Sequence, residues 1–213
     1  HGRPSDVNAH PHTDCSGDFV VVHNGIIENY LTLKEELIEK GHAFKSETDT
    51  EVVAHLLEEV YNGDFEESVR EVLRRIDGSY SLVFMCRQHP DELICTKQDN
   101  PLVIGLGDGE NFIASDIPAI ISRTRRTYIL NDGEMAVVKK DSIVITNRKG
   151  ELVTKKVFEV NWNAEAAEKG GFEHFMLKEI HEQPKAVRDT MSQRVAKDGK
   201  SIVMDELKWT ADY

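Results

Sequence analysis

The sequence predicts an α+β fold, in which a block of helices is followed by a block of short strands. Apolar residues recur at helical spacing from about residue 27 to residue 76. From residue 79 to residue 158, short apolar runs alternate with turn signals. Because helices and strands do not alternate strictly, we expect a layered α+β structure.

The first 78 residues contain one expected strand and three expected helices. Residues 1–17 are polar and read as a loop, and the β-branched run 19–22 predicts a buried strand that ends at His23-Asn24-Gly25. Three apolar stripes at helical spacing follow: Ile27, Tyr30, Leu31, Leu37 and Ile38; Val52, Val53, Leu56, Leu57 and Val60; Val69, Val72, Leu73 and Ile76. Gly41, Asn62-Gly63 and Gly78 are the expected stops. Thr48 and Glu51 have the spacing of a capping box, so the second helix should begin near Asp49.

The strand block is divided by Asn, Asp, Gly and Pro turn signals. The expected strands are 79–86, 92–97, 102–106, 111–115, 127–130, 134–139, 142–146 and 151–158, with a short helix at 117–124. Residues 161–171 read as a linker. Beyond it, Met176, Ile180, Val187 and Met191 share one face of a long helix that Pro184 should kink or end.

Composition excludes several classes of protein. The 213 residues include 26 Lys and Arg against 38 Asp and Glu, a formal net charge of −12. This balance argues against nucleic-acid binding, and no apolar run approaches the roughly 20 residues that span a bilayer. Three cysteines without framework spacing indicate a reducing, cytoplasmic compartment.

Metal, cofactor and cysteine chemistry are not expected from the residue spacing. His10, His12, Cys15 and His23 are of types that suit zinc, but their spacing matches no common zinc pattern, so ordinary loop residues are the preferred interpretation. No glycine-rich phosphate loop is present. None of the three cysteines has the sequence setting of an activated nucleophile.

Asn24-Gly25 and Asp49 each have two interpretations from the residues alone. Asn-Gly is a common turn signal, but an Asn amide and a Gly N–H also suit stabilisation of an oxyanion. Asp49 is either a carboxylate in the first turn of a helix or a carboxylate aimed at a ligand ammonium group.

Several motifs together resemble one family. In order along the chain they are residues 1–12, Val22-His23-Asn24-Gly25-Ile26-Ile27-Glu28-Asn29, Ser46-Glu47-Thr48-Asp49-Thr50-Glu51, 101–107, 112–116 and 174–184. They resemble the glutamine amidotransferase (class II, N-terminal-nucleophile) domain of bacterial-type glucosamine-6-phosphate synthases. The resemblance covers nearly the whole chain, and only 192–213 match loosely.

The resemblance implies a four-layer αββα sandwich of the N-terminal-nucleophile hydrolase type and hydrolysis of glutamine. Asn24 and Gly25 match the oxyanion hole, Asp49 matches the carboxylate that holds the glutamine α-amino group, and His1 and Gly2 match a loop that closes over glutamine. Residues 1–160 would form the amidotransferase domain. Residues 161–213 would lead toward a sugar isomerase domain that binds fructose 6-phosphate, in a homo-oligomeric parent enzyme.

The sequence departs from the family at its start. The family's nucleophile is a cysteine at the mature N-terminus, whereas this sequence begins with His1 inside the closing loop. The resemblance therefore implies an N-terminally incomplete domain that is inactive alone. The alternatives are a domain of another class II amidotransferase and a non-catalytic module that binds glutamine or glutamate.

Overall fold

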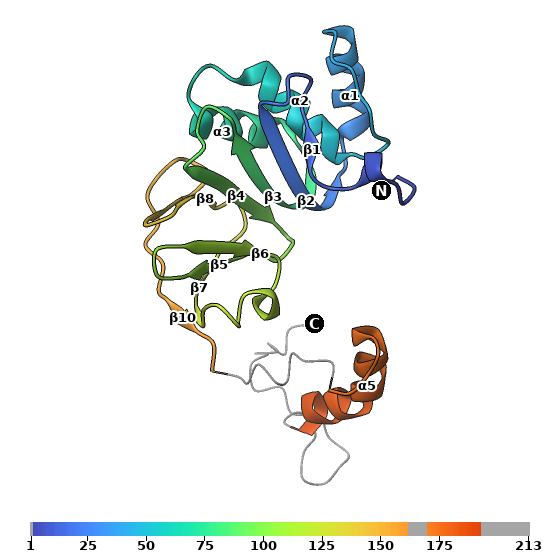
Figure 1. Cartoon of the computed structure of the whole chain (residues 1–213), viewed down its shortest axis with the longest axis vertical. Helices are drawn as coiled ribbons and strands as arrows, with labels where there is room; N and C mark the ends of the chain where they lie inside the picture. Colours follow the sequence, from blue (N-terminus) through green and yellow to red (C-terminus); the bar gives the residue numbers. More distant parts are fainter. Residues whose placement is uncertain (1, 162–169, 193–213) are drawn as a thin grey trace, which may run out of the picture. The chain divides into compact units, whose positions relative to one another are not determined.

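The computed structural model describes residues 2–161 and 170–192 (Figure 1). The chain divides into two compact units, His1–Asn161 and Trp162–Tyr213. All of the strands and three of the helices described below belong to the first unit, which also carries the site residues.

Helices α1 (Tyr30–Glu39), α2 (Thr50–Val60) and α3 (Phe65–Arg75) confirm the three predicted helices. Helix α3 begins where the side chain of Asp64 accepts a hydrogen bond from the backbone N–H of Glu67, at 3.0 Å. Val52, Val53, Leu56 and Leu57 of the α2 stripe are fully buried and Val60 is half-buried, while Val69 and Val72 of α3 are buried as well. The helical periodicity therefore identified the faces that these two helices bury.

A six-stranded antiparallel sheet carries the helices on one face (Figure 1). In sheet order its strands are β1 (His12–Thr13), β2 (Phe19–Ile27), β3 (Gly78–Cys86), β4 (Glu92–Gln98), β8 (Met135–Lys139) and β9 (Ile143–Thr146). The long strands β2 and β3 pair along their whole length, with all nine residues of each strand in register.

A second, four-stranded antiparallel sheet covers part of the other face of the first sheet (Figure 1). Its strands in order are β10 (Phe158–Glu159), β7 (Arg126–Ile129), β5 (Val103–Leu106) and β6 (Asn111–Ala114). Two short 3₁₀ helices, Asp6–Asn8 and Ile117–Ala119, complete the elements of this unit.

Two apolar cores hold these layers together. Alternate residues of a strand point to opposite faces, so the first sheet contributes side chains to both cores. Leu82 and Phe84 of β3 and Ile94 of β4 face the helices, whereas Cys95 of β4 faces the second sheet. Burial raises the pKa of the Cys95 thiol to about 12. Cys95 and the buried Cys86 therefore behave as small apolar side chains, as the sequence predicted.

Four sequence predictions are wrong in their details. Strand β2 does not stop at Asn24-Gly25 but runs on to Ile27, which was expected in a helix, because β3 continues to pair with it as far as Gly78. Residues 117–124 form only the 3₁₀ turn Ile117–Ala119. Residues 151–158 form an isolated bridge at Leu152 and the beginning of β10 rather than one strand.

Helix α5 (Phe175–Ser192) is the described part of the second unit. It runs through Pro184, which was expected to kink or end it, and its Met176, Ile180, Val187 and Met191 are exposed. Most of the expected linker and nearly all of the tail 192–213 lie outside the described residues.

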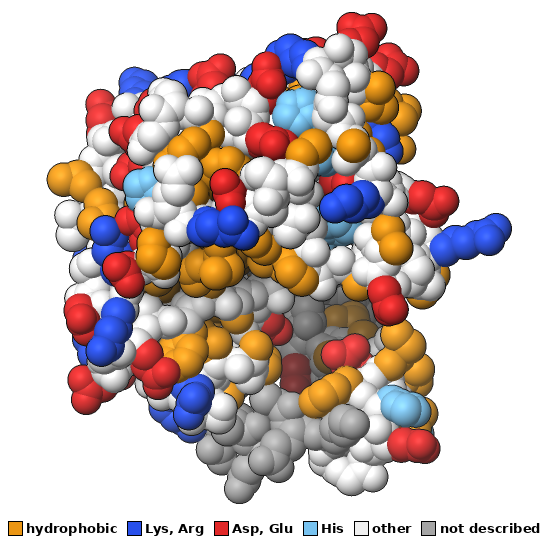
Figure 2. Space-filling view, turned by 45° about the horizontal axis from the view of Figure 1, so that its top comes forward, with side chains coloured by type: hydrophobic (Ala, Val, Ile, Leu, Met, Phe, Trp, Pro, Cys, Tyr) orange, Lys and Arg blue, Asp and Glu red, His pale blue; other side chains and the backbone are white. Residues whose placement is uncertain are grey.

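The described part of the chain contains no helix with the length and apolar character needed to cross a bilayer. On the face shown in Figure 2, Lys and Arg side chains are interspersed with Asp and Glu rather than gathered into one basic patch.

Neighbouring positions on β3 test the division between core and surface. Phe84 is fully buried against the helices, whereas Met85 points to the other face and is 49% exposed. We expect Phe84→Ala to lower the free energy of unfolding by about 3–5 kcal/mol, and Met85→Ala to change it by less than about 0.5 kcal/mol. Urea titration measures both values, and equal losses would contradict the described facing of β3.

Candidate functional site

Strand β2 places Asn24 and Gly25 against β3 in the six-stranded sheet. Gly25 lies opposite Tyr80 of β3 and has a φ of 127°, a conformation that residues with a Cβ rarely adopt. A Cβ added to Gly25 would lie 2.0 Å from the carbonyl oxygen of Ser79. The glycine is thus required by close approach of the β3 backbone and not by a turn, so the turn interpretation is wrong.

Asn24 is exposed and borders a hollow of about 240 Å³. His10, Ser81 and Ser115 line the same hollow. The backbone oxygen of Asn24 accepts a hydrogen bond from Asn100 Nδ2 at 3.0 Å. No described residue forms a hydrogen bond with its side-chain amide, which leaves the amide N–H groups available to a ligand.

Asp49 is held against β2. It is 6% exposed, and its Oδ2 accepts a hydrogen bond from the backbone N–H of Ile27 at 2.7 Å. It is the N-cap residue of α2, but its side chain forms no capping hydrogen bond. Since Ile27 follows Asn24 by three residues, and a strand rises about 3.3 Å per residue, Asp49 is anchored about 10 Å along β2 from Asn24. The fold therefore places Asp49 against the strand that carries Asn24 and Gly25.

The segment leading to Asp49 is fixed by the buried carboxylate of Glu51. Its Oε1 accepts from Lys45 N at 2.8 Å, and its Oε2 accepts from Ser46 N and Ser46 Oγ at 2.6 Å each. The expected capping box is wrong, because Glu51 binds these two residues and not Thr48. Burial by itself would raise the Glu51 pKa, but the hydrogen bonds from Ser46 and Lys45 outweigh it and hold that pKa below its ordinary value.

Gly2 borders a second hollow, of about 520 Å³, which Thr48 and Thr50 also line. Asn8 joins the two segments: its Oδ1 accepts from Glu47 N at 2.9 Å, and its Nδ2 donates to Arg3 O at 2.9 Å. Residues 2–8 thus lie beside the segment that carries Asp49. His1, the remaining sequence-predicted site residue, lies outside the described residues.

His23 lies next to the candidate site residues on β2, and the sequence reasoning missed that it is buried. It is buried, and its Nδ1 lies 2.9 Å from Thr50 Oγ1, while its Nε2 is buried without a hydrogen-bond partner among the described residues. Burial lowers the pKa of His23 to about 4, against a partly opposing effect of Asp49. The alternation of buried and exposed residues along β2 could have predicted that His23 points inward. The sequence analysis instead placed His23 at the end of the strand.

Of the histidines and cysteine weighed as a metal set, the histidines lie near one another but Cys15 contacts other residues. His10 and His12 pack edge to face with ring centroids 5.5 Å apart. Cys15 instead contacts His42 and His55, with Sγ to Nδ1 distances of 3.8 and 3.6 Å.

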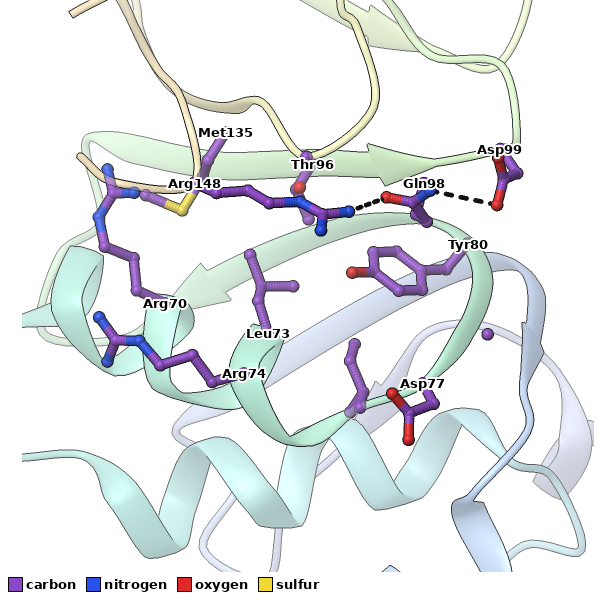
Figure 3. A pocket seen from close by; sticks show the side chains of 13 residues that line it. Arg70, Leu73, Arg74, Asp77, Tyr80, Thr96, Gln98, Asp99, Met135 and Arg148 are labelled. Atoms are coloured by element: carbon purple, nitrogen blue, oxygen red, sulfur yellow. Dashed lines mark hydrogen bonds between the residues drawn. The ribbon is translucent and has the colours of Figure 1, made fainter. Parts of the chain in front are cut away.

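A cavity of about 500 Å³ lies beside α3, β3 and β4 and contains none of the sequence-predicted site residues (Figure 3). Arg70, Arg74 and Arg148 line it. The first two are neutralised by carboxylates on their own helix, at 2.7 Å for Glu66 and 2.9 Å for Glu67, and Arg148 donates to Gln98. We therefore place the site at β2 and the start of α2.

Lowering the pH should destabilise the protein through His23. A histidine whose pKa falls from 6.5 to about 4 on folding contributes full stability above pH 6.5, and this contribution is lost as the pH falls toward 4. The expected loss is about 3 kcal/mol. His23→Gln should remove this part of the pH dependence of urea unfolding, whereas the exposed His174→Asn should preserve it. An unchanged slope in His23→Gln would refute the assignment.

Two glycine substitutions separate close approach from backbone strain. Gly25 and Gly41 both have positive φ, but a Cβ on Gly41 meets nothing within 4 Å. Gly41→Ala should cost about 1–2 kcal/mol, the strain of a left-handed residue. Gly25→Ala adds a clash with a neighbouring strand and should cost about 2–6 kcal/mol in thermal or urea unfolding. Equal costs would show that the β3 backbone does not constrain Gly25.

Similar proteins point to one family. The family model described as a glutamine amidotransferase domain matches residues 4–122. Glutamine–fructose-6-phosphate aminotransferase (isomerizing) of Caldanaerobacter subterraneus subsp. tengcongensis is 56% identical over 212 residues, which are 100% of this chain and 35% of that protein. The enzyme of the same name from Aquifex aeolicus is 54% identical over 191 residues, covering 90% of this chain and 32% of that protein.

A solved structure supports the fold. Glutamine phosphoribosylpyrophosphate amidotransferase from B. subtilis matches 70% of this chain and 33% of its own, with a TM-score of 0.58 and 24% sequence identity. This likeness confirms the predicted fold class. The family match over residues 4–122, which are more than half of the chain, shows that the chain belongs to the glutamine amidotransferase domain family.

Proposed function

We propose that this chain is the glutaminase, or ammonia-supplying, part of an enzyme that makes glucosamine 6-phosphate and glutamate from fructose 6-phosphate and glutamine. The chain spans about 35% of the length of the curated relatives it matches. Their printed name, glutamine–fructose-6-phosphate aminotransferase, supports the choice of the two substrates. Fructose 6-phosphate would bind a separate sugar isomerase domain, and the proposed setting is a homo-oligomer in the cytoplasm.

The anchoring of Asp49 on the strand that carries Asn24 and Gly25 is the observation on which this proposal rests. Asp49 Oδ2 accepts a hydrogen bond from Ile27 N, whereas Asp49 Oδ1 receives no hydrogen bond from a described residue. A buried carboxylate is costly unless it is paired. The α-ammonium group of glutamine would supply the missing partner.

Asn24 and Gly25 are proposed to stabilise the oxyanion that forms when the glutamine amide is attacked. The Asn24 side-chain N–H groups and the Gly25 backbone N–H are the donor types that such a site uses, because they favour negative charge that develops only in the transition state. Gly2, and by resemblance His1, would border bound glutamine.

The nucleophile is not proposed to be any of the three cysteines in this chain. Cys86 and Cys95 are buried in the sheet, and burial raises the pKa of Cys95 to about 12, so its thiolate is disfavoured. Cys15 contacts His42 and His55 rather than Asn24 or Gly25.

Binding of glutamine tests the role of Asp49 without requiring turnover. Asp49→Asn keeps an acceptor for Ile27 N–H and removes only the charge. We expect it to weaken glutamine binding by about 10- to 100-fold, the worth of one hydrogen bond to a charged group. Isothermal titration calorimetry on the protein expressed from its complete gene measures this change, and Asp108→Asn, in an exposed loop, is the matched control.

A ligand lacking the charge sharpens the test. Nα-acetylglutamine has no ammonium group, so it should bind the wild-type protein weakly and should lose little more with Asp49→Asn, because both changes remove the same interaction. Equal weakening of both ligands by Asp49→Asn would contradict the proposed pairing, and unaltered glutamine affinity would exclude Asp49 from the site.

A further inference from the structure

Three separate segments bring potential metal ligands to one point at the side of α2. Cys15 lies in the loop between β1 and β2, His42 lies in the connection between α1 and α2, and His55 and Glu58 lie on α2 itself. Their ligand atoms all lie within 4.8 Å of one another. None of these residues is part of the proposed glutamine site.

Four of the six separations between the ligand atoms are close to the edges of a coordination tetrahedron, and the other two are at most 4.8 Å. Zinc bonds of about 2.3 Å to sulfur and about 2.05 Å to nitrogen imply edges of about 3.6 Å for sulfur to nitrogen and about 3.4 Å for nitrogen to nitrogen. Cys15 Sγ lies 3.8 Å from His42 Nδ1 and 3.6 Å from His55 Nδ1. Glu58 Oε2 lies 3.0 Å and 3.5 Å from the same two nitrogen atoms.

The outer nitrogen of each imidazole faces a carboxylate. His42 Nε2 lies 3.2 Å from Glu59 Oε2, and His55 Nε2 lies 3.4 Å from Glu51 Oε1. Both rings therefore direct Nδ1 to the centre and Nε2 to an acceptor, the arrangement that orients metal-binding histidines.

The sulfur atom of Cys15 is also positioned for ligation. The backbone N–H of Ala43 donates to Cys15 Sγ at 3.4 Å, a contact that stabilises a thiolate. Asp14 shapes the loop by accepting hydrogen bonds from Phe19 N at 2.8 Å and Ser16 N at 3.0 Å. Cys15 N–H donates to Glu58 Oε2 at 3.2 Å, which keeps the loop against α2.

From this geometry we propose that Cys15, His42, His55 and Glu58 bind one zinc-type divalent cation. One thiolate, one carboxylate and two neutral imidazoles neutralise a 2+ charge, and this mixture of sulfur, nitrogen and oxygen ligands suits zinc. Four protein ligands make the site structural: the cation would fasten the β1–β2 loop and the α1–α2 connection to α2.

Metal titration of the protein expressed from its complete gene tests the site, after dialysis against a chelator. Equilibrium dialysis with Zn²⁺ should give one more tightly bound equivalent per chain for the wild-type protein than for Cys15→Ser or His42→Gln. Co²⁺ should produce a thiolate-to-cobalt charge-transfer band that Cys15→Ser abolishes. Glu59→Gln removes the carboxylate that faces His42 Nε2, together with the ion pair between Glu59 and Lys40, and should weaken Zn²⁺ binding by about 10- to 100-fold.

The controls separate ligand loss from misfolding. Cys86→Ala and His89→Gln replace a cysteine and a histidine outside the cluster and should retain the full zinc stoichiometry and the cobalt band. Cys15 is exposed, so Cys15→Ser should fold, which circular dichroism verifies. Equal zinc content in the wild-type protein and Cys15→Ser, or a cobalt spectrum without a thiolate band, would overturn the proposal. Neither readout involves glutamine.

Discussion

Glu51 is buried at the start of α2, where its carboxylate receives hydrogen bonds from Lys45 N, Ser46 N and Ser46 Oγ and faces His55 Nε2. A buried charge is tolerated only when its oxygens are satisfied, so these donors must stay in place for the helix to pack. Because Glu51 binds Ser46, it fixes the backbone segment that leads to Asp49. Because it faces His55 Nε2, it also sets the orientation of that ring in the proposed metal cluster. One carboxylate therefore positions two different groups of residues.

Helix α2 is the rigid element common to both sites. Asp49 immediately precedes it, and His55 and Glu58 lie one and two turns further along the same helix. Its apolar residues Val52, Val53, Leu56 and Leu57 are fully buried, so displacing α2 would open the main core. Groups mounted on such an element keep their geometry better than groups on a loop. Cys15 and His42 come from loops, and a cation bound to them would add the constraint that their backbone lacks.

Local signals in the sequence predicted much of the fold and less of the site. Helical periodicity located α1, α2 and α3, because those patterns depend on neighbours within one or two turns. Asn24-Gly25 was assigned to the end of a strand, because the same dipeptide occurs both in turns and where a neighbouring strand approaches closely. Only the contact with Ser79, which is distant in the sequence, distinguishes the two cases. Cys15 and His42 are 27 residues apart, so no spacing rule joined them. The roles of Asn24, Gly25 and Asp49 came from family resemblance.

Where β2 meets α2, buried polar side chains differ in how many of their atoms form hydrogen bonds within the fold. This difference separates a side chain that supports the structure from one that is available to a ligand. Both oxygens of Glu51 are used by the fold, which is the normal condition of a buried carboxylate. Asp49 and His23 lie beside it, and each is bound by the fold through one atom only: Oδ2 of Asp49 by Ile27, and Nδ1 of His23 by Thr50. Their second polar atoms have no partner among the described residues. Glu51 thus supports the fold with both oxygens, whereas the second oxygen of Asp49 is the one that, in the proposed site, would pair with a positively charged group of a bound molecule.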